Sequence, residues 1–299
     1  VERDRNQTEF RRSFEDYLAI TANEERVETG RAEFRNRASL LGQIEARYGV
    51  PPQIVVAIWG VESRYGTRRG DVPVISATAT LAYDGRRGAF FEQQLIAALR
   101  ILERGDVTPD RMTGSWAGAM GHTQFIPTSY ETFAVDFQGD GRRDIWSDDP
   151  TDALASAAAY LSRSGWRRGQ PWVTEALPGT SGGSVLQPQS PGPSFRVYGN
   201  FNVIKRYNNS DSYALAVGYL ANRIAGEGPL RTAFGPDATG LTQDDRKELQ
   251  ERLTRAGYDT GGTDGVIGPR SQGAIAAYQR NNALAATGRP SPELLARLR

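Results

Sequence analysis

Apolar residues recur every three or four positions along much of this chain, a spacing that places them on one face of an α-helix. Near the start the repeat is carried by Phe10, Phe14, Tyr17, Leu18, Leu40, Leu41 and Ile44. Later the same spacing appears at Tyr213, Ala216, Val217, Leu220 and Ile224. We therefore expect helices within residues 1–50 and over 95–102, 152–162 and 212–225, the third also favoured by its alanine content.

Proline and glycine mark where such segments begin and end. Pro51-Pro52 can open a helix over the apolar run that follows it. Residues 113–129 are rich in Gly and Ser and interleaved with aromatic residues, which predicts a shaped loop over a pocket. Residues 178–194 are expected to form an irregular insertion, and a minor hairpin is expected near 195–203. The predicted fold class is mainly α.

The last sixty residues or so look like a separate small module. Helices are predicted over 241–256, 271–281 and 292–298, joined by glycine-rich turns. Because Gly-Pro pairs interrupt residues 227–240, we place domains at 1–230 and 241–299 with a linker at 231–240. Asp264, Gly265 and Arg270 lie in the module's most motif-like turn, although turn geometry alone explains an Asp and a Gly there.

Composition narrows the chemistry that this chain can perform. The formal net charge is +1 over 299 residues, so the chain lacks the strong positive charge typical of nucleic-acid-binding proteins. It has no Cys and one His, His122, which excludes a cysteine nucleophile and disfavours a histidine-based metal site or triad. Acid–base chemistry would therefore fall to carboxylates.

No apolar run approaches the length needed to span a bilayer, so we expect no transmembrane segment. Val1 stands where a start methionine would be, and we expect that a leader or anchor segment has been removed.

Glu62 is the carboxylate that stands out, because it sits inside the apolar run Val55-Val56-Ala57-Ile58-Trp59-Gly60-Val61. Apolar surroundings disfavour the charged form of a carboxyl group and raise its pKa. A carboxyl that keeps its proton near neutral pH can protonate the leaving oxygen of a glycosidic bond. Taken alone, such a Glu is better explained as the polar edge of an amphipathic helix.

Several motifs in the same order resemble the membrane-bound lytic transglycosylase B family of bacterial wall enzymes. They are Gly60-Val61-Glu62-Ser63-Arg64-Tyr65-Gly66, Gly118-Ala119-Met120-Gly121 with Gln124-Phe125-Ile126-Pro127-Thr128-Ser129-Tyr130, Asp140-Gly141 with Asp144-Ile145-Trp146, and Arg206-Tyr207-Asn208-Asn209-Ser210. The C-terminal module resembles the three-helix peptidoglycan-binding domain appended to such enzymes, through Leu249-Gln250, Asp264-Gly265-Val266-Ile267-Gly268 and Ala277-Tyr278-Gln279.

The resemblance implies a lysozyme-like helical catalytic domain that cleaves the β-1,4 bond between N-acetylmuramic acid and N-acetylglucosamine in peptidoglycan. It assigns Glu62 as the single acid/base and implies 1,6-anhydro-N-acetylmuramic acid ends formed without water. A hydrolytic muramidase stays open, because Asp71, Asp84, Asp106 or Asp110 could be a second carboxylate across the cleft. A non-catalytic wall-binding protein is the third reading, and intact Glu62, Ser115 and Gln124 argue against it.

The resemblance also implies substrate-binding residues. Those that match family positions in or near the site are Ser115, Gln124, Tyr160, Tyr207, Asn208 and Tyr213. Aromatic faces can stack on sugar rings, although tyrosines in helices are also common core residues, and Ser115 could be a turn residue. Arg86 and Arg87 match a basic pair that could meet stem-peptide carboxylates, with a solvated surface pair as the alternative.

Residues 136–147 look like a calcium loop, which some members of the family carry. Asp136 and Asp140 occupy the first and fifth positions and Gly141 permits the sharp turn at the sixth. The loop departs from the template where Gln138 takes the third position and Ser147 the twelfth. The candidate ligands are Asp136, Gln138, Asp140, Arg142 and Asp152. Calcium here would be structural, the chemistry needs no cofactor, and a metal-free loop held by side-chain hydrogen bonds is the alternative.

The partners expected from these resemblances are peptidoglycan glycan strands, with no nucleic acid, and proteins of the wall machinery. A monomer in the periplasm is expected. A wall-binding module would tether the catalytic domain to its insoluble polymer and raise its local concentration there.

Overall fold

The computed structural model describes residues 1–5 and 12–299, so the predicted contribution of Phe10 lies outside the described residues. Its helices are α1 (Glu2–Arg5), α2 (Phe14–Thr21), α3 (Glu24–Asn36), α4 (Ala38–Tyr48), α5 (Pro52–Ser63), α6 (Val74–Asp84), α7 (Gly88–Glu103), α8 (Pro127–Phe133), α9 (Thr151–Arg163), α10 (Gly199–Tyr207), α11 (Asp211–Ile224), α12 (Gln243–Arg255), α13 (Pro269–Asn281) and α14 (Pro292–Leu298). The strands are β1 (Val72–Pro73), β2 (Thr113–Gly114), β3 (Val173–Glu175), β4 (Ser184–Leu186) and β5 (Phe195–Val197). The predicted mainly helical fold class is confirmed.

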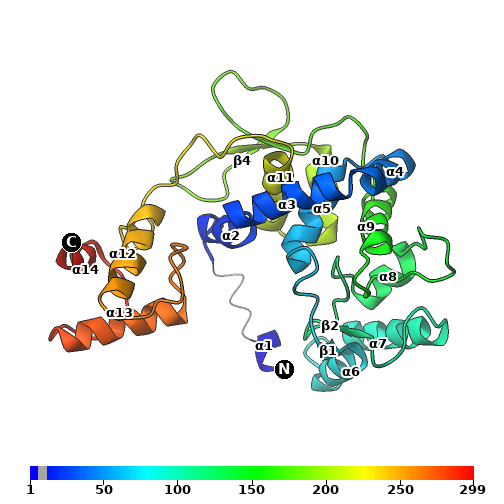
Figure 1. The fold of residues 1–299 in the computed structure, drawn as a ribbon, viewed down its shortest axis with the longest axis horizontal. Helices are drawn as coiled ribbons and strands as arrows, with labels where there is room; N and C mark the ends of the chain where they lie inside the picture. Colours follow the sequence, from blue (N-terminus) through cyan, green and yellow to red (C-terminus); the bar gives the residue numbers. More distant parts are fainter. Residues whose placement is uncertain (6–11) are drawn as a thin grey trace.

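Helix α5 lies at the centre of the larger domain (Figure 1) and packs against α3, α4, α9 and α11. Pro52 opens it, as predicted, because the missing N–H of proline costs nothing in the first turn. Residues 54–60 are all buried, so this helix is apolar on every side and needs neighbours all round. The buried helix fixes the position of Glu62, which lies in its last turn.

A second core cluster lies under helices α6, α7 and α8. Val74, Met120, Phe125, Tyr130 and Ile145 are among its buried members, so residues 113–126 contribute to a core as well as to the surface. Strands β1 and β2 pair antiparallel at the edge of this region. Helix α6 was not predicted, because its apolar positions are interrupted by Ser and Thr.

The predicted hairpin near residues 195–203 is wrong in part. β5 is the middle strand of a three-stranded antiparallel sheet with the order β3-β5-β4. The chain then enters α10 at Gly199, where Phe201, Val203 and Ile204 turn one helical face into the core. Strand β4 lies within residues 178–194, so the insertion predicted as irregular carries one edge of this sheet.

The C-terminal module is a three-helix unit with a core of its own, as predicted. Leu249 and Leu253 of α12 pack with Ile275 of α13 and with Leu294 and Leu295 of α14. A capping box at Thr242 fixes where α12 starts. In Figure 1 the module, drawn orange to red, lies to one side of the larger domain. No helix in the described part of the chain is long and apolar enough to cross a membrane.

Candidate functional site

Glu62 ends helix α5 as a partly buried carboxyl group facing helix α11. The hydroxyl of Tyr213, in the first turn of α11, donates a hydrogen bond of 2.6 Å to Glu62 Oε1. Burial raises the pKa of Glu62 to about 7, against the lowering effect of the bond from Tyr213. A carboxyl group in this state is both an acid and a base near neutral pH, as glycosidic cleavage requires.

Three tyrosines form a continuous aromatic surface beside this carboxyl. The rings of Tyr207 and Tyr213 stack with centroids 6.5 Å apart, and Tyr160 meets Tyr207 at 4.8 Å. The Tyr207 hydroxyl donates to the carbonyl of Thr123 at 2.7 Å, and the Tyr160 hydroxyl donates to that of Arg206 at 2.6 Å. Burial, and then the nearby charge of Glu62, raises the pKa of both Tyr207 and Tyr213, so both stay neutral donors.

The turn after Glu62 is fixed by a serine and by left-handed backbone. Ser63 Oγ donates to the carbonyl of His122 at 2.5 Å and accepts from the amide of Gly66 at 3.0 Å. Arg64 and Tyr65 adopt positive φ values of 50° and 55°, a conformation that costs non-glycine residues energy and is kept only where the surroundings impose it. The chain therefore leaves α5 in one defined direction.

Tyr65 is held from behind by the N-terminal helices. Its hydroxyl donates to the carbonyl of Arg26 at 2.7 Å, and the Arg26 guanidinium donates to the carbonyl of Gly60 at 2.6 Å. Only glycine fits at position 60, because a Cβ there would come within 2.7 Å of the Tyr65 ring. Helix α3 thus supports the end of α5 that carries Glu62.

His122 is a functional neighbour that the sequence analysis did not assign. It is buried, and its Nδ1 accepts a hydrogen bond of 3.0 Å from Trp59 Nε1 of α5. Because Nδ1 accepts, Nε2 carries the proton and donates to the carbonyl of Ser147 at 2.7 Å. Burial lowers the pKa of His122, so it stays neutral and ties residues 121–124 to the helix of Glu62. The signal in the sequence is a lone His inside the glycine-rich motif.

Ser115 and Gln124 both shape the loop that the sequence analysis placed over a pocket. Ser115 Oγ accepts from the amides of Ala117 and Ala119, which is the turn role that was its alternative reading. Gln124 has a positive φ of 53°, and its Nε2 donates to the carbonyls of Arg69 and Gly121. Their substrate-binding roles stay predictions.

The remaining predicted binding residues are Asn208, Arg86 and Arg87. Asn208 is exposed and follows the last residue of α10, next to Tyr207. Arg86 forms a two-point ion pair with the buried carboxylate of Asp4, so part of its binding capacity is already used. Arg87 lies 4.3 Å from the centroid of the Phe90 ring. A stem-peptide carboxylate would have to compete with Asp4 for Arg86, which leaves Arg87 as the freer of the two cations.

The four candidate second carboxylates are placed as follows. Asp84 is paired with Arg5 at 2.8 Å, and Asp106 with Arg143 at 2.6 Å. Asp71 and Asp110 are exposed, and a hydrogen bond from Thr108 is the main cause that lowers the pKa of Asp110. A general acid needs a raised pKa, so Asp110 does not resemble Glu62. Asp84 and Asp106 are already engaged by arginines.

Hydrogen bonds within the predicted calcium loop hold its backbone in place. Asp136 accepts the amide hydrogens of Gly139, Asp140 and Gly141, and Asp140 accepts that of Arg142. Gln138 uses its amide to donate to Asp149 rather than presenting it to the loop centre. These donors and acceptors are thus engaged with the loop itself.

Asp152, the proposed replacement for the missing acidic ligand, is buried beneath the loop. Its Oδ1 accepts the amides of Phe137 and Gln138, and its Oδ2 accepts that of Asp144. The three backbone amides bonded to its two oxygens make this carboxylate an anchor of the loop. In the described parts of the chain, no three His, Cys, Asp or Glu side chains gather as a metal site would need. Calcium binding by this loop therefore stays a prediction.

In the C-terminal module, the motif-like turn is built by its own side chains. Asp264 Oδ1 accepts the amide of Val266, and Gln250 Oε1 accepts the amide of Gly265. Gly265 is buried with a φ of 78°, whereas Asp264 and Arg270 are exposed. Turn geometry thus accounts for the Asp and the Gly, as the alternative held, and a binding role for these residues and Arg270 stays a prediction.

Comparison with known proteins gives two family matches. Residues 1–182 and 178–222 match the transglycosylase SLT domain, and residues 242–298 match a putative peptidoglycan binding domain. Membrane-bound lytic murein transglycosylase B of Escherichia coli (strain K12) is 37% identical over 211 residues. That match covers 60% of this chain and spans 58% of the relative's length.

Solved structures show the same fold. The crystal structure of SltB3 from Pseudomonas aeruginosa, in complex with NAG-NAM-pentapeptide, is similar with a TM-score of 0.73 and 44% sequence identity, covering 96% of this chain and 87% of that one. The lytic transglycosylase Slt35 of Escherichia coli, in complex with calcium, has a TM-score of 0.63 at 32% identity, covering 71% and 78%.

The transglycosylase match covers well over half of the chain, and it includes Glu62 at the end of α5, the tyrosines around it and the loop that His122 ties to α5. The chain belongs to the transglycosylase SLT family and carries a peptidoglycan-binding domain at its C-terminal end.

Proposed function

We propose that this protein is a peptidoglycan lytic transglycosylase in which Glu62 is the single acid/base. The observation that carries the proposal is the partly buried carboxyl of Glu62, whose pKa is raised to about 7 and which accepts a hydrogen bond from the hydroxyl of Tyr213. It is supported by the family match and by relatives whose names describe lytic transglycosylases. The SltB3 complex with NAG-NAM-pentapeptide supports a wall glycan as the substrate class.

The reaction begins with proton donation. Tyr213 donates to Oε1, so the acidic proton of Glu62 is carried by Oε2, which transfers it to the β-1,4 oxygen as the C1–O bond breaks. The N-acetyl carbonyl oxygen of the muramyl sugar bonds to C1 and takes the place of a second carboxylate, as in substrate-assisted glycosidases. The leaving sugar departs with its new hydroxyl group.

The second half closes the anhydro ring. Glu62, now a carboxylate, takes the proton of the muramyl 6-hydroxyl while that oxygen bonds to C1 and displaces the N-acetyl oxygen. Glu62 regains its proton, so the cycle is balanced and consumes no water. Tyr207 and Tyr213 shield one side of the carboxyl with apolar ring surface, which favours attack by the 6-hydroxyl over attack by water.

A substitution series tests this assignment. Glu62→Gln keeps the shape of the side chain and removes its proton chemistry, so release of soluble fragments from purified sacculi should fall by at least about a thousandfold. Glu28→Gln, at an exposed glutamate of the same domain, is the matched control and should keep full activity. Turnover that survives in Glu62→Gln would refute the assignment.

We propose that the loop of residues 136–152 is held without a tightly bound metal. The support is the set of backbone amides that engage Asp136 and Asp152. Slt35 has been solved in complex with calcium, and the loop of residues 136–147 here has Ser147 where the calcium-loop template has an acidic twelfth residue.

A periplasmic site of action follows from the proposed substrate. Action on the wall as a monomer, and association with other wall proteins, belong to the same proposal.

A further inference from the structure

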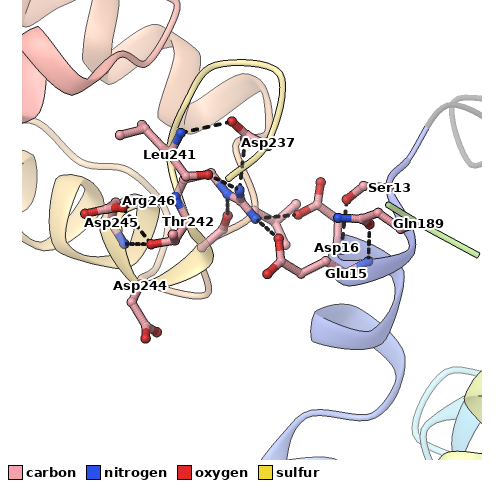
Figure 2. Close-up of polar contacts among 12 residues, drawn as sticks. Ser13, Glu15, Asp16, Gln189, Asp237, Leu241, Thr242, Asp244, Asp245 and Arg246 are labelled. Carbon is pink, nitrogen blue, oxygen red and sulfur yellow. Dashed lines mark hydrogen bonds and ion pairs between the residues drawn. The ribbon is translucent and has the colours of Figure 1, made fainter. Parts of the chain in front are cut away.

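Arg246 of helix α12 is a buried cation at the junction between the C-terminal module and the larger domain, with 2% of its surface exposed. Figure 2 shows its guanidinium directed at three carboxylates. Nη2 bonds Glu15 at 2.7 Å and Asp16 at 3.2 Å, and Nη1 bonds Asp237 at 2.9 Å. Glu15 and Asp16 belong to α2 of the larger domain, so one side chain joins the two parts of the molecule.

The remaining donors of Arg246 bind its own module and the segment before it. Nε donates to the carbonyl of Gly265 at 2.7 Å, and Nη1 donates to that of Leu241 at 3.2 Å. The planar guanidinium thus holds the motif-like turn, the end of the linker and α2 at fixed mutual angles, which a single ammonium group could not do.

Helix α2 is itself fixed to the domain that carries Glu62. Ser13 caps it through the amide of Asp16, and Gln189 accepts the amide of Glu15 (Figure 2). The Phe14 ring packs edge-on against Phe195 of β5 at 5.6 Å. Glu15 therefore has a fixed position relative to the core of the larger domain.

Residues 231–240, predicted as a linker, are also docked to the larger domain. Glu175 of β3 accepts the amides of Arg231 and Thr232 at 2.8 and 2.7 Å. Phe234 lies 6.2 Å from the ring of Phe14, and the amide of Gly235 donates to the carbonyl of Pro191. The linker predicted at 231–240 therefore follows a fixed course along the larger domain.

The surfaces around Arg246 are not close-packed. A cavity of about 300 Å³ separates α2 from the module, with Leu18, Ala22 and Phe234 on one side and Gln243, Lys247 and Asp264 among its other lining residues. The junction therefore depends on the Arg246 contacts rather than on a broad apolar interface.

We propose that Arg246 is a positioning residue, which sets the peptidoglycan-binding module at a fixed place relative to Glu62 so that a long glycan strand held by the module enters the catalytic site in a defined register. The proposal rests on the proposed function. If Arg246 has this role, breaking the junction should reduce activity on polymeric peptidoglycan. Activity on short fragments should not change, because they reach Glu62 without the module.

The test uses the full chain with Glu15→Gln and Asp16→Asn combined. This double variant removes the two charges of α2 and leaves the contacts of Arg246 with Asp237, Leu241 and Gly265 in place. We expect KM for sacculi to rise about tenfold, as when a second binding event loses its geometric coupling, while kcat/KM on a short soluble NAG-NAM oligosaccharide stays within about twofold. Solution X-ray scattering should show a larger radius of gyration, and trypsin should cut residues 226–240 faster.

Glu248→Gln is the matched control, because it breaks ion pairs with Arg252 and Arg299 that lie within the module. It should match the wild type in every readout. Arg246→Lys changes the module's half of the same contacts. It should likewise raise KM for sacculi and leave kcat/KM on the short oligosaccharide nearly unchanged.

Two results would overturn the proposal. One is a double variant with unchanged scattering, proteolysis and KM for sacculi. The other is equal loss of activity on polymer and oligosaccharide, which would indicate damage to the catalytic domain. A wild-type protein that cleaves neither substrate would refute the proposed function, and scattering and proteolysis would then still decide whether Arg246 fixes the module.

Discussion

The hydroxyl of Tyr213 reaches across from α11 to donate a 2.6 Å hydrogen bond to Oε1 of Glu62 at the end of α5. This bond favours the ionised carboxyl and so opposes the effect of burial on the Glu62 pKa. The two effects together leave that pKa at about 7, where the group can give and take a proton in one catalytic cycle.

Removing this hydroxyl should shift the titration of Glu62 upward. In Tyr213→Phe the pKa of Glu62 should rise above that of the wild type, because the bond that stabilises the charged form is gone. We expect kcat to fall by about ten- to a hundredfold, with the basic arm of the pH–rate profile moved to higher pH. The profile of the variant on sacculi measures both effects.

Tyr83→Phe is the control for this experiment, since Tyr83 is 95% exposed. A Tyr213→Phe profile that coincides with the wild-type profile would show that the bond does not set the acidity of Glu62.

Glu62 should lower stability at alkaline pH. Its pKa in the folded state lies above the ordinary value of 4.5, so its favourable contribution is complete below that value and is lost as pH rises towards about 7. Glu62→Gln should therefore be more stable than the wild type at pH 8, by up to about 3 kcal/mol, and similar to it at pH 4.5. Urea unfolding at the two pH values measures the difference, and equal stability at pH 8 would contradict a raised pKa.

His122 should have the opposite effect. Its pKa in the folded state is lowered by burial, so its contribution is complete above the ordinary value of 6.5 and is lost as pH falls through the lower folded value. Protonation would place a hydrogen on Nδ1 against the donor Trp59. His122→Gln should be less stable at neutral pH by about 1–3 kcal/mol and lose less stability on acidification than the wild type does. A parallel pair of stability–pH curves would argue against a neutral His122.

The stability of the loop of residues 136–152 should depend on Asp152 more than on calcium. Asp152→Asn weakens three bonds from backbone amides and should lower stability by about 2 kcal/mol, whereas Asp140→Asn, at an exposed position, should change it by less than about 1 kcal/mol. Melting curves with EGTA and with added calcium should coincide for the wild type. A calcium-dependent rise in melting temperature would show that the loop binds the ion after all.

Local sequence patterns predicted the helices that hold the site residues better than they predicted which of those residues meet in the folded chain. The start of α5 at Pro52 and its apolar run follow from residues close together in the chain. The partner of Glu62 lies 151 residues away, so only the resemblance to a family pointed to Tyr213. His122 was missed as a positioning residue because its role depends on Trp59 and Ser147, which approach it only in the folded chain.

Two segments show what local pattern does not reveal. Residues 199–203 resemble a strand with alternating apolar positions, but the chain forms α10 there because the helix buries Phe201 and Ile204 together. The glycine and proline content of residues 231–240 predicts a linker, but it does not indicate that Glu175 and Phe14 dock this segment to the larger domain. Both outcomes depend on tertiary contacts that are remote in sequence.

Digestion of purified sacculi in water enriched in heavy oxygen, with mass spectrometry of the soluble muropeptides, tests whether Glu62 closes an anhydro ring without water. We expect 1,6-anhydro-N-acetylmuramic acid ends that carry no heavy oxygen, formed by the wild type and not by Glu62→Gln. Reducible ends that carry the heavy isotope would contradict it, because they require water as the nucleophile and a second group to activate it.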